Sequence, residues 1–342
     1  MGNLTFSTWA FNIGLPLSLL AAGFAPGATG FSPRLLPPPG IAQRSAVVAA
    51  ALDGARLLHA EVKSSSIPDT VSFLSDIGME VQRTDATGAP FVAFDGEVSQ
   101  FELRVVGCAS QEGAARDVVS GVSVAVDDIA AAVARAQQSG GEVLRDVHNV
   151  TYVASMVPNE EIDQPQPWQL RGVLRDPASG FEVELIQHAS SSPRPAGVVN
   201  HVSLRVQDVD EATSFYTSTM GMTLHRKRSL VPTEPALSAF LSYEKAEFDH
   251  TLLELRYTYG NSKPLVPLPS RGPSTIAVSA PVIEDAVADL TGAKDGQDGD
   301  APSVVEGPIE GVADDAALVS AAPGMQFVFV DELEVVMKRT GI

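Results

Sequence analysis

Histidine and glutamate recur at corresponding places along the chain, and together they could bind a metal ion. His59 is followed by Glu102, and His201 by Glu254, with a similar run of predicted strands and helix between the two members of each pair. Glu184 closes a further run of the same kind. Because alternate side chains of a strand point to the same face, we expect these residues to face a cleft. Several buried carboxylates would need a cation or a proton, so the recurrence favours metal coordination over isolated polar groups in the core.

The composition excludes several other kinds of site. The one cysteine, Cys108, can form no internal disulfide and no cysteine-rich zinc or iron–sulfur site. The 42 acidic and 23 basic residues give a net charge of −19, which repels nucleic-acid phosphates. We therefore expect a small-molecule substrate, no nucleic-acid partner, and a metal held only by histidine and carboxylate.

The elements that position these residues form a repeated unit of one strand, one helix and three strands. The clearest internal match sets 57–63 (LLHAEVK) beside 199–205 (VNHVSLR), each read as a strand and followed by an amphipathic helix. The strands at 101–104 (FELR) and 253–256 (LELR) match in the same way. These two stretches therefore read as two copies of one unit.

Two further units follow the same plan. One runs from a strand at 121–126 to a strand at 183–186, and the other runs from 274–279 to 335–337 with a helix over 283–290. The positions that strand alternation turns inward in these units are Val122, Glu184, Thr275 and Val336.

The predicted fold class is α+β, with four tandem βαβββ modules in two domains. The domains cover 55–190 and 198–342, and a Ser/Pro-rich linker at 191–197 joins them. Each module buries one sheet face and must pair, which predicts curved mixed sheets around an open cleft. Because the duplication lets one chain form this pseudo-dimeric pairing, we expect a monomer.

Residues 1–52 differ from the rest because they contain no Asp or Glu. The apolar stretch at 9–24 is short for a membrane-spanning helix and resembles the apolar region of a signal-type sequence. The Gly-Phe junctions at 23–24 and 30–31 are similar to those of the bipartite plastid presequences of algae with secondary plastids. We expect a cleaved presequence, a plastid location and no membrane association of the mature form. A secretory or other organellar address, a disordered tail or a membrane anchor are the alternatives.

Four strings, HVSLRV, SFYTSTMGMTLHRKR, TLLELRYTYG and DPASGFEVELIQ, resemble the long two-domain form of glyoxalase I (lactoylglutathione lyase), in the vicinal oxygen chelate superfamily. The resemblance implies that the second and third units share a metal site with His201, Glu254 and Glu184 as ligands. Val122 would stand where the family usually has a second histidine. The first and fourth units would form a second, degenerate cleft with His59 and Glu102.

The same resemblance implies a metal-dependent lyase that converts the hemithioacetal of glutathione and methylglyoxal to S-lactoylglutathione, and so detoxifies methylglyoxal. The ligand set suits zinc, nickel, cobalt or manganese, and glutathione would be the co-substrate. Glu184 would be the catalytic base, and Arg205 would hold the glutamyl carboxylate of glutathione. Thr258 occupies the position where the family usually has an asparagine that binds glutathione.

Departures from the family pattern leave two alternatives. Val122 cannot bind a metal, and the segment 168–171 lacks the usual lysine-bearing glycine loop. The chain could therefore be another metalloenzyme of the superfamily with a different substrate, or a divergent binding protein without catalytic activity. A nearby histidine could replace the missing ligand, although we expect each to face solvent; these are His188, His225 and His250.

Overall fold

A computed structural model describes most of the chain after residue 51. The described residues are 52, 54–95, 101–110, 112, 114, 117–150, 169–188, 196–230, 234–245, 247, 250–260, 271–281, 303–306, 316–322 and 325–331. The expected presequence lies outside them apart from Leu52, as do most of the linker, the helix at 283–290 and the strand at 335–337.

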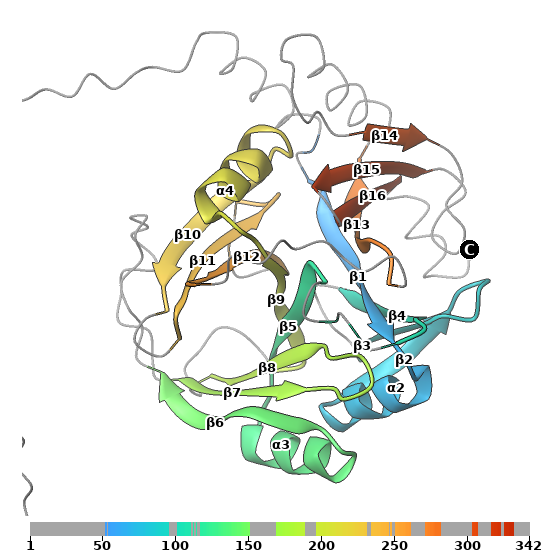
Figure 1. Ribbon diagram of the computed structural model, residues 1–342, viewed down its shortest axis with the longest axis vertical. Coiled ribbons are helices and arrows are strands. Elements are labelled where there is room, and N and C mark those ends of the chain that lie inside the picture. Colours follow the sequence, from blue (N-terminus) through green and yellow to red (C-terminus); the bar gives the residue numbers. More distant parts are fainter. Residues whose placement is uncertain are drawn as a thin grey trace, which may run out of the picture. The chain divides into compact units, whose positions relative to one another are not determined.

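The first three predicted units each appear as a strand, a helix and three strands (Figure 1). The first unit consists of β1 (Arg56–Ser64), α2 (Ile67–Asp76), β2 (Met79–Thr84), β3 (Pro90–Phe94) and β4 (Glu102–Gly107). The second consists of β5 (Val119–Ala125), α3 (Ile129–Gln138), β6 (Glu142–Val150), β7 (Gln169–Arg175) and β8 (Glu182–Gln187). The third consists of β9 (Val198–Arg205), α4 (Val209–Ser218), β10 (Thr223–Ser229), β11 (Ala236–Ser242) and β12 (Leu252–Thr258).

The described strands of the fourth unit are β13 (Ser274–Ala280), β14 (Ser303–Glu306), β15 (Ala316–Ala322) and β16 (Met325–Asp331). β16 runs parallel to β13, with Thr275 opposite Gln326 and Ala277 opposite Val328. It takes the place beside β13 that β4 takes beside β1. The sequence predicted the closing strand of this unit at 335–337. In the structure, β16 is the strand that lies beside β13 in the closing place.

The units pair across the predicted domain boundary. One eight-stranded sheet has the order β14-β15-β16-β13-β1-β4-β3-β2, and the other has the order β10-β11-β12-β9-β5-β8-β7-β6. Each sheet thus joins two units through antiparallel first strands, β1 with β13 and β5 with β9. The second and third units share one sheet, as the resemblance implies, and the predicted fold class is confirmed.

The helices cover the sheet faces that point away from the candidate site. Phe73 and Leu74 of α2, Ala132 and Ala136 of α3, and Tyr216 of α4 are buried in one hydrophobic core with the apolar faces of both sheets. Local sequence fixes where the helices begin: the Asp128 and Asp208 side chains accept hydrogen bonds from backbone N–H groups in the first turns of α3 and α4. The opposite faces of the sheets remain available for polar residues.

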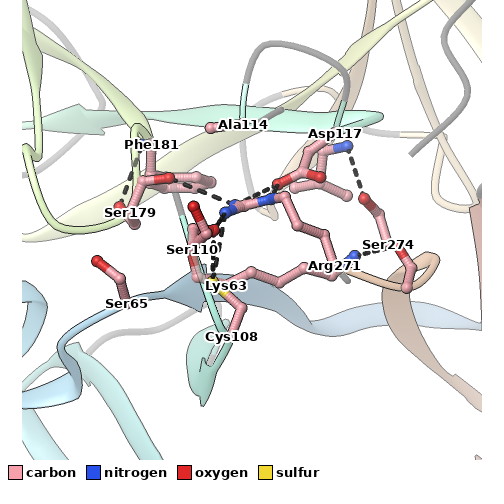
Figure 2. Close-up of polar contacts among 12 residues, drawn as sticks. Lys63, Ser65, Cys108, Ser110, Ala114, Asp117, Ser179, Phe181, Arg271 and Ser274 are labelled. Carbon is pink, nitrogen blue, oxygen red and sulfur yellow. Dashed lines mark hydrogen bonds and ion pairs between the residues drawn. The ribbon is translucent and has the colours of Figure 1, made fainter. Parts of the chain in front are cut away.

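A buried ion pair ties the units together, as Figure 2 shows. The Arg271 guanidinium, 1% exposed, donates to Asp117 Oδ2 at 2.6 and 2.9 Å. It also donates to the carbonyls of Lys63 on β1, Ser110, and Ser179 in the turn before β8. Segments from the first, second and fourth units therefore meet at one side chain, which has no counterpart among the predicted site residues.

Candidate functional site

Strand pairing brings the three predicted metal ligands to one face of the second sheet. Ser123 of β5 lies opposite both His201 of β9 and Glu184 of β8. Glu254 of β12 lies opposite Ser203, two residues beyond His201 on the same strand face. The four strands at the centre of this sheet therefore turn one histidine and two glutamates toward the same space.

The three side chains also converge. His201 Nε2 lies 3.3 Å from Glu254 Oε2 and 3.7 Å from Glu184 Oε2. The side chains of His201 and Glu254 are about 95% buried, and that of Glu184 is 14% exposed. Three residues far apart in sequence thus form one buried cluster, the grouping that the resemblance implies.

Hydrogen bonds hold Glu254 in its ionised form. Ser203 Oγ donates to its Oε2 and Ser238 Oγ donates to its Oε1 at 2.7 Å. Burial alone would raise the pKa of Glu254, but the charge of His201 and the hydrogen bonds from His201, Ser203 and Ser238 lower it to about 2. Glu254 is therefore a carboxylate throughout the physiological pH range.

Glu184 is paired with an arginine that the sequence analysis did not select. Arg171 Nη1 lies 3.0 Å from Glu184 Oε1, and both side chains are largely buried. Burial raises the pKa of Glu184, but the charges of Arg171 and His201 outweigh it, so the pKa lies below its ordinary value. Glu184 is thus an ionised group that could accept a proton.

The prediction that Val122 occupies the vacant ligand position is wrong. The β5–β9 pair is symmetric about Val122 and Val202, with Gly121 opposite Ser203 and Ser123 opposite His201. Val122 points the other way, into the hydrophobic core. The residue equivalent to His201 is Gly121, and a Cβ there would lie 2.2 Å from the backbone oxygen of Glu182.

The donor atoms suit a divalent metal ion in type and approximate spacing. Ligand bonds of about 2.0–2.2 Å place two donors on one ion about 3.0–3.4 Å apart, close to the observed separations. Among the residues that the structure describes, however, no three His, Cys, Asp or Glu side chains are arranged as a ready-made metal site. Arg171 binds Glu184 Oε1, while Glu184 Oε2 is the oxygen that lies nearer to His201.

The two predicted substrate-binding residues lie on the same strands but do not touch the cluster. Arg205, at the end of β9, donates to the carbonyls of Ala114 and Asp117 and lies 3.4 Å from Glu182 Oε1. Thr258 is exposed at the end of β12. Arg205 is thus held by protein groups, and Thr258 faces solvent.

The sequence analysis missed a group of arginines on this face of the sheet. Arg145 on β6 and Arg256 on β12 both form ion pairs with Glu234, and Arg171 pairs with Glu184. The alternation that selected Glu254 would also have selected Arg256, two residues further along the same strand. Arginine does not bind metal ions, so these residues were not among the predicted ligands.

In the second predicted cleft, the predicted ligand Glu102 forms an ion pair. His59 lies opposite Glu102 in the β1–β4 pair, and Arg83 Nη2 lies 2.7 Å from Glu102 Oε2. Arg104 lies opposite Glu61, and its guanidinium pairs with Glu61 at 2.6 Å. Arg104 lies opposite the residue two positions after His59, just as Glu254 lies opposite the residue two positions after His201. Arg104 and not Glu102 is therefore the structural equivalent of Glu254, so the FELR and LELR strings are offset by two residues.

The remaining histidines do not complete the metal site. His225, expected to face solvent, is 5% exposed, so that prediction is wrong. Its Nε2 lies 2.7 Å from Ser242 Oγ, and His250 Nε2 lies 2.8 Å from the same atom. His188 Nδ1 lies 2.9 Å from Gln169 Nε2. These contacts pair the three histidines with Ser242 and Gln169, and no contact of theirs with Glu184 or Glu254 is seen among the described residues.

Comparison with known proteins identifies the class to which this architecture belongs. Residues 198–312 match the family model of the Glyoxalase/Bleomycin resistance protein/Dioxygenase superfamily. The crystal structure of glyoxalase I from Zea mays superposes with a TM-score of 0.60 at 22% identity, covering 83% of this chain and 95% of that chain. A variant of the same maize protein gives a TM-score of 0.62 at 22% identity, over 86% and 99% of the two chains. The fold is therefore that of glyoxalase I.

Sequence relatives agree with the fold. A lactoylglutathione lyase of Arabidopsis thaliana is 26% identical over 60% of this chain and 68% of its own length. A probable chloroplastic lactoylglutathione lyase of the same plant is 46% identical, but the match spans only 18% of this chain and 17% of the relative. The chain is thus similar in sequence to lactoylglutathione lyases and has the fold of glyoxalase I. No helix among its described residues is long and apolar enough to cross a membrane.

Proposed function

We propose that this chain is a metal-dependent glyoxalase I-type lyase that isomerises the hemithioacetal of glutathione and a 2-oxoaldehyde such as methylglyoxal to S-lactoylglutathione. The observation that carries the proposal is the approach of His201 Nε2 to within 3.3 and 3.7 Å of two glutamate oxygens, on the inner face of a glyoxalase I fold. Relatives named lactoylglutathione lyase support the substrate class.

His201, Glu254 and Glu184 would hold the metal. A divalent ion supplies a Lewis acid that stabilises the negative charge developing on the two substrate oxygens. Zinc, nickel, cobalt and manganese all accept such nitrogen and oxygen donors. Gly121 contributes no side chain, so at least one coordination position would be left to water or substrate.

Glu184 would move the proton. The reaction removes a proton from the carbon that carries sulfur and returns one to the neighbouring carbon, so the base must be ionised when substrate binds. The lowered pKa of Glu184 meets this requirement at neutral pH, because Arg171 and His201 outweigh its burial. Arg171, 3.0 Å away, would orient the carboxylate and keep it ionised.

The test uses the full chain, stripped of metal with a chelator and reloaded with nickel or zinc. We expect one bound ion per chain by elemental analysis and a rise in thioester absorbance with methylglyoxal and glutathione. The Glu184→Gln variant should lose at least about 100-fold in kcat, since general base catalysis typically contributes that much. No turnover with either metal would refute the enzyme, and undiminished turnover of the variant would refute the role of Glu184.

A binding protein without catalytic activity is the second candidate. The absent side chain at Gly121 and the ion pair of Glu184 with Arg171 both favour it. It predicts that the chain binds S-methylglutathione, an unreactive analogue, yet retains no stoichiometric metal and produces no thioester. Metal content and turnover, measured on the same preparation, separate the two candidates.

We also propose a plastid location and a monomeric state. The chloroplastic name of one relative and the acid-free residues 1–52 support the first. A fusion of residues 1–52 to a fluorescent protein should enter the plastid, and an exclusively secretory or cytosolic signal would contradict this. The sheets that join units of one chain support the second, which light scattering would test.

A further inference from the structure

One carboxylate links two arginines from distant strands, on the sheet face that carries the candidate metal site. Glu234, two residues before β11, forms ion pairs with Arg145 of β6 and with Arg256 of β12. The Glu234 side chain is 8% exposed, whereas the two arginines are 31% and 28% exposed. A buried carboxylate is therefore held between two guanidinium groups that still reach solvent.

The sheet order shows that this bridge joins strands that lie far apart in the sheet. β12 and β6 are separated by β9, β5, β8 and β7, which amounts to five strand intervals. On a flat sheet, five intervals of about 4.8 Å would separate them by about 24 Å, too far for two arginine side chains to meet at one carboxylate. The sheet must curve, and the Arg145–Glu234–Arg256 bridge joins its two sides.

The bridge lies within electrostatic range of the proposed catalytic base. Burial lowers the pKa of Arg145 and of Arg256, and for both the charge of Glu184 is the largest opposing influence. The charge of Arg171 also lowers the pKa of both arginines, and the charge of Arg145 lowers that of Arg256. Two guanidinium groups thus share the single carboxylate of Glu234, and this arrangement favours an anion between them.

We propose that Arg145 and Arg256 form a carboxylate-binding site where they meet across the curved sheet, and that a carboxylate of the substrate replaces Glu234 there. Guanidinium groups bind carboxylates through paired charge-assisted hydrogen bonds, and a substrate carboxylate offers the same two oxygens as Glu234. The inference deepens the proposed function, and its catalytic consequence rests on that function. The carboxylate-binding site itself does not rest on the proposed function, because it depends only on Arg145, Arg256 and the Glu234 carboxylate between them.

The test is calorimetric titration of the full chain with S-methylglutathione, its diethyl ester and succinate. The Glu234→Gln variant keeps the shape of the side chain but removes the competing charge. It should bind S-methylglutathione and succinate about tenfold more tightly than the unaltered chain, a difference of about 1.4 kcal/mol. Arg145→Gln should bind both about tenfold more weakly. The ester, which has no carboxylate, should show neither change.

Matched controls separate the site from the overall charge. Glu80→Gln, exposed on β2 of the other sheet, and Arg135→Gln, exposed on α3, change the net charge by the same amounts and should leave both affinities unaltered. Equal or weaker binding of both probes by a folded Glu234→Gln variant would overturn the proposal. If that variant does not fold, unchanged binding of both probes by Arg145→Gln would overturn it.

The two proposals can fail separately. If succinate follows the expected pattern while S-methylglutathione binds no variant, the carboxylate site stands and glutathione is excluded as the co-substrate. If S-methylglutathione binds the unaltered chain and no variant changes its affinity, the carboxylate site is wrong, and the proposed function is still supported.

Discussion

Replacement of Gly121 by alanine tests the reason why this site lacks a fourth side-chain ligand. An added Cβ would lie 2.2 Å from the backbone oxygen of Glu182 and 3.0 Å from its carbonyl carbon. Unstrained contacts between heavy atoms need about 3.5 Å, so β5 and β8 would have to part by about 1 Å at this point. The residue lacks a positive φ, so space rather than backbone conformation is what demands glycine.

The expected cost follows from that displacement. Overpacking of a close-packed interior typically costs about 1–3 kcal/mol, and each weakened backbone hydrogen bond between the strands adds about 1 kcal/mol. We therefore expect Gly121→Ala to lower the free energy of unfolding by about 3 kcal/mol. At about 2–4 °C per kcal/mol, the melting temperature should fall by about 6–12 °C.

The assay is thermal unfolding followed by circular dichroism, with Gly107→Ala as the matched control. Gly107 also lies in a strand with no positive φ, but a Cβ there would meet only a side-chain atom of Ile67 at 3.9 Å. Its replacement should change the melting temperature by less than about 2 °C. A Gly121→Ala variant as stable as the Gly107→Ala control would refute the steric argument. It would then be reasonable to expect a histidine at 121 to restore the family's ligand.

Three further predictions concern the hydrogen bonds and ion pairs of buried carboxylates. Ser238→Ala should lower the free energy of unfolding by about 1.5 kcal/mol at pH 7, measured by urea titration. Folding lowers the pKa of Glu254 from 4.5 to about 2, so the loss should shrink as the pH of the titration falls from about 5 toward 2. An equal loss at pH 7 and at pH 2 would contradict the charge-assisted bond. Arg171→Gln should raise the pKa of Glu184 and so move the acidic limb of the kcat/KM profile to higher pH, while an unmoved limb would deny Arg171 that effect. Arg271→Met should cost about 3–5 kcal/mol in urea unfolding, because it leaves a buried carboxylate unpaired, and a cost below 1 kcal/mol would show that the ion pair is dispensable.

The fold was largely predictable because it repeats. Matching strings at 57–63 and 199–205 predicted strands where β1 and β9 lie. The helix after each strand begins at a residue type that commonly precedes helices: Ser66, with Pro68 in the first turn, for α2, and Asp208 for α4. The fourth unit was less predictable at its end. β16 contains the apolar run MQFVFVD, but the sequence analysis placed the closing strand at the run of valines that follows. Only the parallel pairing with β13 decides which run lies beside the first strand.

The vacant ligand position shows where strand reasoning has its limit. A one-residue error in counting sends every side chain of a strand to the opposite face. The string GVSVAV aligns with HVSLRV so that Gly121 lies under His201, one residue before the valine that strand alternation was taken to turn into the cleft. The register of β5 against β9 corrects this, and the close approach of Glu182 explains why no side chain is present.

The arginines were not predictable as a group, because their arrangement depends on sheet curvature. Arg145 and Arg256 are five strands apart and belong to different repeats, so nothing in their spacing along the chain relates them. They meet only because the sheet closes far enough for both to reach Glu234. Histidine and glutamate recur at the centre of the sheet, where the repeat symmetry acts, and so could be found from sequence. The arginines proposed to bind the substrate lie toward the edges of the sheet. The two repeats differ there, so the repeat symmetry does not predict these residues.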